Sequence, residues 1–134
     1  MSHTEITEDG VEFTYDSNGN EIHAKYSDGF EAWFEYDENG NEIHYKDSSG
    51  YEAWYNSNGR IIHAKYSNGY EEWYEYDDKG NLIHAKYSNG FEEWYEYDSN
   101  GSRIHLKDTD GYEEWYDADG YQITKEEFDK LYSK

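Results

Sequence analysis

The chain has 134 residues, the length of one ordinary domain, and 32 Asp and Glu against 11 Lys and Arg give a formal net charge of −21. This charge repels nucleic-acid phosphates and anionic lipid head groups, so it argues against nucleic acid and membrane surfaces as partners. Low hydropathy with high charge is typical of disorder, but aromatic residues make up 20% of the chain, and disordered segments are poor in them. We therefore expect a single folded repeat domain over residues 1–134, with a core built from rings.

The N-terminal segment, residues 1–18, is expected to form a cap on the repeats that follow. Its start, MSHTEITEDG, has neither a basic region nor an apolar run and is unlike a signal peptide. The chain has no Cys, which excludes disulfides and thiolate metal sites. A cytoplasmic location is the resulting expectation.

The glycines mark the turns of the next segment, residues 19–121. They recur every nine to eleven residues, and ten of the twelve follow Asn or Asp. Asn-Gly and Asp-Gly supply the two positive-φ residues of a two-residue hairpin turn, and runs rich in Tyr, Trp, Phe and Ile lie between them. The absence of Pro fits strands that donate ladder hydrogen bonds.

Two such strands make one repeat, which begins at Ile22, Ile43, Ile62, Ile83 and Ile104, in steps of 21, 19, 21 and 21 residues. The shorter step removes two residues, which keeps each side chain on its own face of the sheet. Two-residue turns predict that Lys86 lies opposite Glu93 and Ala85 opposite Trp94. One face would then carry Ile, Ala, Trp and Glu, and the other His, Lys and Tyr or Phe. The fold expected is all-β: an antiparallel meander of tandem hairpin repeats of about 20 residues, in a single twisted or coiled sheet.

The last segment, about residues 124–133, reads as a short capping helix. Thr124 and Glu127 have the spacing of a capping box, and Phe128, Leu131 and Tyr132 share one helical face. We expect this helix to cover an open edge of the sheet.

Three stretches, FEYDENGNEI, YEYDDKGNLI and YEYDSNGSRI, resemble the YD repeat of Rhs and teneurin-like proteins. The resemblance runs over about residues 11–121 and implies a β-strip that coils on itself. It implies the fold alone, because five or six units are too few to enclose a toxin as the large members do. MORN-like repeat antitoxins share similar motifs, and choline-binding cell-wall repeats share Trp-Tyr before a Gly turn.

Five histidines recur in the repeat and raise the question of a metal site: His23, His44, His63, His84 and His105. Equivalent strands of a meander are about 9.5 Å apart, whereas metal ligands lie near 2 Å from one centre. We therefore expect neither metal nor cofactor, and histidines that pack beside Tyr or Phe.

Two further rows are candidate partner-binding residues: the tryptophans Trp33, Trp54, Trp73, Trp94 and Trp115, and the glutamates Glu31, Glu52, Glu71, Glu92 and Glu113. The rings could serve as platforms or cation cages, but core packing is the favoured interpretation. The glutamates occupy equivalent positions, and an acid and a base need unlike environments, so no catalytic residue is expected.

Two functional hypotheses follow. The first is a non-catalytic module that binds a basic protein, such as an immunity protein or antitoxin that neutralises a basic toxin domain. The second is a structural or surface-binding repeat protein whose aromatic row holds glycan or choline. The sequence leaves both open.

Overall fold

The computed structural model describes residues 1–132 and shows an antiparallel meander of 13 strands followed by one helix. The chain divides into two compact units, Met1–Glu71 and a second that begins at Glu72. The first unit holds β1 (His3–Ile6), β2 (Glu12–Tyr15), β3 (Glu21–Lys25), β4 (Glu31–Tyr36), β5 (Glu42–Asp47), β6 (Glu52–Tyr55) and β7 (Ile61–Lys65). The expected all-β hairpin meander is confirmed.

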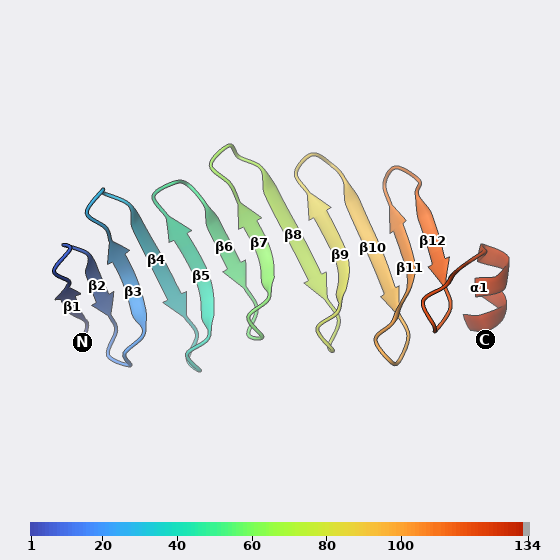
Figure 1. Ribbon diagram of the computed structural model, residues 1–134, viewed down its shortest axis with the longest axis horizontal. Coiled ribbons are helices and arrows are strands. Elements are labelled where there is room, and N and C mark those ends of the chain that lie inside the picture. Colours follow the sequence, from blue (N-terminus) through green and yellow to red (C-terminus); the bar gives the residue numbers. More distant parts are fainter. Residues whose placement is uncertain (133–134) are drawn as a thin grey trace. The chain divides into compact units, whose positions relative to one another are not determined.

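Strand β8 (Glu71–Tyr76) starts at the last residue of the first unit and otherwise belongs to the second. The second unit also holds β9 (Leu82–Tyr87), β10 (Glu92–Tyr97), β11 (Arg103–Asp108), β12 (Glu113–Tyr116), β13 (Gln122–Ile123) and α1 (Lys125–Tyr132). Within each unit the strands lie side by side in sequence order (Figure 1). Whether the two units behave as the single domain expected from the sequence stays a prediction.

The turns differ from the two-residue type that the sequence predicted. All twelve glycines have positive φ, between 82° and 98°, but no other described residue does. In one example the Gly29 N–H donates to Tyr26 C=O at 3.0 Å and the Tyr26 N–H donates to Phe30 C=O at 2.8 Å. This is a three-residue loop in which a type I turn is followed by a left-handed glycine. The prediction was wrong because the residue before the glycine stays in the ordinary right-handed region.

The longer loop shifts the register of every hairpin by one residue. In the β9–β10 hairpin, Lys86 lies opposite Glu92 and His84 opposite Trp94, and β11–β12 likewise pairs His105 with Trp115. A shift of one residue exchanges the faces of the second strand. The predicted separation of His from Trp is therefore wrong: the two share a face, and Ala, Ile, Tyr and Phe occupy the other.

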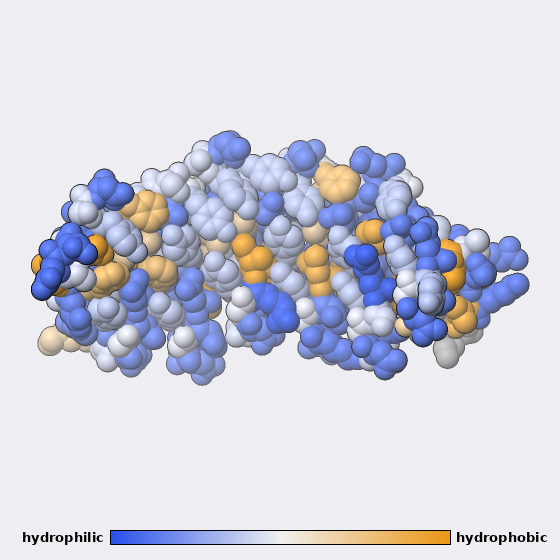
Figure 2. Space-filling view, in the orientation of Figure 1, coloured by the Kyte–Doolittle hydropathy of each residue, from blue (hydrophilic) through white to orange (hydrophobic). Residues whose placement is uncertain are grey.

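The most buried side chains are small. Ala24, Ala32, Ala53, Ala64 and Ala85 are at most 3% exposed, and of the larger hydrophobic residues Ile104 is buried. Rings of the same face lie around the alanines, as the Phe34–Tyr45 and Tyr45–Tyr51 contacts at 5.3 and 6.0 Å show. The expected core of rings is thus corrected to alanines flanked by half-exposed rings. In Figure 2 the hydrophobic residues form small separate patches between hydrophilic ones.

Both ends of the chain depart from the repeat. At the N-terminus, Thr4 pairs with Thr14 in place of a His–Trp pair, and their hydroxyls hydrogen-bond at 3.0 Å. At the C-terminus the predicted capping box is present, since the Glu127 N–H donates to Thr124 Oγ1 and the Thr124 N–H to Glu127 Oε1. Helix α1 packs through Phe128, whose ring lies 5.7 Å from that of His105. Residue 133, the predicted end of the helix, lies outside the described residues.

Candidate functional site

Within each unit the predicted binding residues share one face of the strands, which we call the histidine face. It carries the repeat histidines, the tryptophan row and the glutamate row defined above. Cross-strand His–Trp pairs stack their rings: the ring centres of His23 and Trp33 are 5.4 Å apart at 22°, and those of His84 and Trp94 are 5.4 Å apart at 12°. These histidines therefore pack beside Trp and not beside Tyr or Phe as expected, although His105 also contacts Phe128 of α1.

The tryptophans are neither core residues nor fully exposed platforms. Trp33 is 38% exposed and Trp94 is 37% exposed. Each has one flat side against its histidine, and the register places Lys46 opposite Trp33 and Lys107 opposite Trp94. Because none of the five tryptophans of the described residues is buried, the favoured interpretation of the row as buried core is wrong.

The glutamate row binds the histidines. Glu31, Glu52, Glu71, Glu92 and Glu113 each lie within 2.7–2.9 Å of the Nε2 atom of the histidine eight residues earlier. This contact follows from the hairpin register, which puts His and Trp opposite each other and Glu two residues before Trp. The row is therefore half-buried and partly neutralised when the histidines are protonated.

A second set of glutamates was missed by the sequence analysis. Glu35, Glu75 and Glu96 contact the Nδ1 atoms of His44, His84 and His105 from the preceding strand. These three glutamates are 64–69% exposed. The signal in the sequence was a Glu nine residues before each of these histidines. Such a Glu occurs only where the strand before the histidine strand is one of the long ones, β4, β8 or β10. Where the step is short, Trp54 takes that place opposite His63.

The two carboxylates shift the protonation of the histidine between them. Burial alone lowers the pKa of His84, but hydrogen bonds to Glu75 and Glu92 outweigh burial and raise it above its ordinary value. An imidazole whose two nitrogens are engaged by separate carboxylates is favoured in its doubly protonated, cationic form. Glu75 and Glu92 thus favour a positive charge on His84.

The same contacts turn the histidine nitrogens away from any shared centre. Among residues 1–132, no group of three or more His, Cys, Asp or Glu side chains could hold a metal ion. None of the helices formed by these residues is long and apolar enough to cross a membrane.

The Tyr-Asp pairs of the sequence build the turns and the opposite face, which we call the alanine face. Asp37 Oδ1 accepts the backbone N–H groups of Asn39 and Asn41, both at 2.9 Å. The Tyr36 hydroxyl donates to the Glu21 carbonyl at the start of the neighbouring strand β3 at 2.6 Å. In the second unit Tyr97 and Asp98 repeat this arrangement, with Tyr97 donating to the Leu82 carbonyl at 2.7 Å. The Tyr thus joins the two neighbouring strands of its repeat, and the Asp closes the turn that follows.

These features agree with a family comparison. The family model described as the teneurin YD-shell matches residues 2–133. The chain belongs to the teneurin YD-shell family. The Tyr-Asp motif of this YD-shell chain is therefore the family's structural repeat, and the resemblance noted in the sequence is confirmed.

Solved structures show the same fold as this YD-shell chain. A Tc holotoxin pore from Photorhabdus luminescens matches with a TM-score of 0.52 and 18% identity, and the match covers 87% of this chain and 7% of that chain. The crystal structure of TcdB2-TccC3 matches with a TM-score of 0.50 and 17% identity over 83% of this chain and 7% of that chain. The YD-shell chain thus spans a small fraction of these structures. No curated protein matches it.

Proposed function

We propose that this YD-shell chain is a non-catalytic module that binds a basic protein through its histidine face. The observation that carries the proposal is the row of exposed carboxylates, Glu35, Glu75 and Glu96, beside half-exposed indole rings. Glutamates beside aromatic rings attract Lys and Arg side chains through charge and through the ring face.

An immunity or antitoxin role is the specific form of this proposal, with a basic toxin domain as the partner. Two features support it: the net charge of −21, and the origin of the similar folds in Tc toxin structures. The meander itself needs alternating strands and turns but no such charge, and the self-repulsion opposes folding. A basic partner would relieve that repulsion.

The test measures association rates of the purified protein with a basic partner isolated by pull-down from lysate of the source cell. The triple variant Glu35→Lys, Glu75→Lys and Glu96→Lys is compared with a control that reverses three exposed glutamates of the turns and helix, Glu8, Glu38 and Glu126. We expect the association rate to fall by at least about tenfold in the triple variant but not in the control. The rate should also fall steeply as salt is raised. A rate indifferent to salt, or equal losses in both variants, contradicts the proposal.

The aromatic row supports a second candidate function, the binding of choline or glycan. It rests on Trp33 and Trp94, which are each more than a third exposed. Choline that quenches Trp fluorescence in a saturable way, with the response lost in Trp94→Ala, would favour this candidate over protein binding.

A further inference from the structure

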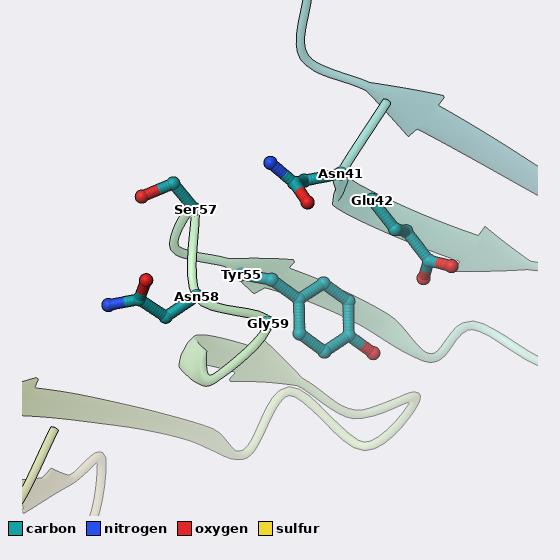
Figure 3. A pocket seen from close by; sticks show the side chains of 6 residues that line it. All are labelled: Asn41, Glu42, Tyr55, Ser57, Asn58 and Gly59. Carbon is teal, nitrogen blue, oxygen red and sulfur yellow. The ribbon is translucent and has the colours of Figure 1, made fainter. Parts of the chain in front are cut away.

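A cleft lies in the first unit, and none of its lining residues belongs to the histidine, tryptophan or glutamate rows. It has a volume of about 350 Å³ and is lined by Asn41, Glu42, Tyr55, Ser57, Asn58 and Gly59. These residues come from the start of β5, the end of β6 and the turn that follows β6. Figure 3 shows the Tyr55 ring beside the Glu42 side chain, with Asn41 and Ser57 nearby.

Glu42 lies in this cleft without a counter-ion. Burial raises the pKa of its carboxyl group above the ordinary value. No hydrogen bond or ion pair engages the carboxylate within residues 1–132, although most other glutamates of the strands bind a histidine or tyrosine. A half-buried carboxylate without a partner is costly, so a cation in the cleft would be bound favourably.

The second unit shows which side chain can occupy the position equivalent to Glu42. Sixty-one residues further along the chain, Arg103, Tyr116 and Gly120 stand where Glu42, Tyr55 and Gly59 stand. They line an equivalent but smaller cleft of about 170 Å³. There the Arg103 guanidinium carbon lies 5.5 Å from the centre of the Tyr95 ring and 6.0 Å from that of Tyr116. The repeat thus has room for a guanidinium beside this tyrosine.

We propose that the Glu42–Tyr55 cleft binds a guanidinium group, supplied by an arginine side chain of another protein. Tyr55 offers the ring face that Tyr116 offers to Arg103, and Glu42 adds the charge partner. Asn41 and Ser57 add side-chain oxygens that accept N–H groups. A planar guanidinium stacks on a ring while it donates to a carboxylate in its own plane, which an ammonium cannot do. The cleft lies outside the histidine face, so this inference is independent of the function proposed above.

The test is an NMR titration with N-acetyl-arginine amide at constant ionic strength, with N-acetyl-lysine amide and choline as competing cations. Constant ionic strength matters because a net charge of −21 attracts every cation weakly. In the wild type we expect saturable shifts at Tyr55 and Gly59 with arginine amide. Dissociation constants for the other two cations should be at least about tenfold higher.

Three variants decide the assignment. Glu42→Gln should weaken arginine binding by about tenfold, as expected for the loss of a charged acceptor. Glu42→Arg should abolish it by filling the cleft, and the equivalent Arg103 indicates that this residue is compatible with the fold. Arg103→Glu should create a second response at Tyr116 and Gly120. The proposal is overturned if wild type shows no saturable shift, if lysine or choline binds equally well, or if Glu42→Gln binds as wild type does.

Discussion

At the scale of single residues, each tryptophan of the histidine face depends on its imidazole neighbours. Trp54 is the one in the short repeat, and it stacks on two histidines: its ring centre lies 5.1 Å from that of His44 and 4.3 Å from that of His63. Trp94 stacks on His84 at 5.4 Å and is 37% exposed. The two positions share a sequence motif but differ in their surroundings.

We therefore expect Trp54→Ala to lower the free energy of unfolding more than Trp94→Ala. The second stacked ring should account for a difference of about 1 kcal/mol, the usual strength of an aromatic pair beyond its buried area. Urea unfolding of both variants measures this difference. Equal losses would show that the His63 contact adds nothing.

The glutamates on either side of His84 should make stability depend on pH. The pKa of His84 is raised in the folded protein by Glu75 and Glu92, so the contribution is fully present below the unfolded pKa of about 6.5 and is lost as pH rises through the folded pKa. Glu75→Gln should therefore lower the Tm more at about pH 6 than at about pH 8.5. Thermal unfolding at both pH values checks this, with Glu38→Gln, in a turn, as the control. A larger effect of Glu75→Gln at the higher pH would contradict the expected sign.

At the scale of elements, each hairpin loop contains a glycine with positive φ. Most glycines face open space, but Gly50 does not: a Cβ there would lie 2.9 Å from Ser67 Cβ and 3.1 Å from Ser67 Cα. Its φ of +98° resembles the +93° of Gly29, which has nothing within 4 Å of a Cβ. The tips of two neighbouring hairpins thus approach closely at Gly50.

Gly50→Ala should consequently destabilise the protein more than Gly29→Ala. Both carry the strain of positive φ, about 1 kcal/mol or more, and the clash with Ser67 should add about 1 kcal/mol. Chemical unfolding gives both values. If the double variant Gly50→Ala with Ser67→Gly recovers part of the loss, the clash is the cause; no recovery would exclude it.

At the scale of the whole molecule, charge is the dominant property. The formal net charge is −21 over 134 residues. Among residues 1–132, lysine side chains form two ion pairs, Lys125–Asp129 and Lys130–Glu126, and both are i,i+4 pairs on α1. Such exposed pairs contribute little. Repulsion between carboxylates should therefore oppose folding at low ionic strength.

We expect the Tm to rise when NaCl is increased from about 10 mM to about 300 mM, because the Debye length falls from about 30 Å to below 8 Å and the repulsion is screened. Scanning calorimetry with NaCl and KCl separates screening, which is the same for both salts, from specific cation binding. A Tm that falls with salt would show that attractive pairs outweigh the repulsion.

Local sequence determined the elements of this protein and their order. Glycine spacing placed the turns, the 21- and 19-residue steps placed the repeats, and the Thr124–Glu127 capping box placed α1. The Tyr-Asp motif also indicated the family. These features could be predicted because turn glycines, helix caps and strand periodicity depend on residues close together in the chain.

The tertiary structure alone decided which side chains meet. Two-residue and three-residue loops both suit an Asn-Gly or Asp-Gly sequence, yet one residue of register decides whether His84 faces Trp94. Only that register reveals Glu75 on the far nitrogen of His84, and only the packing of adjacent hairpins leaves Glu42 unpaired beside Tyr55. The face that a side chain occupies and the residues that it contacts depend on how the strands pair. The energy of the whole sheet selects that pairing, and no single repeat specifies it.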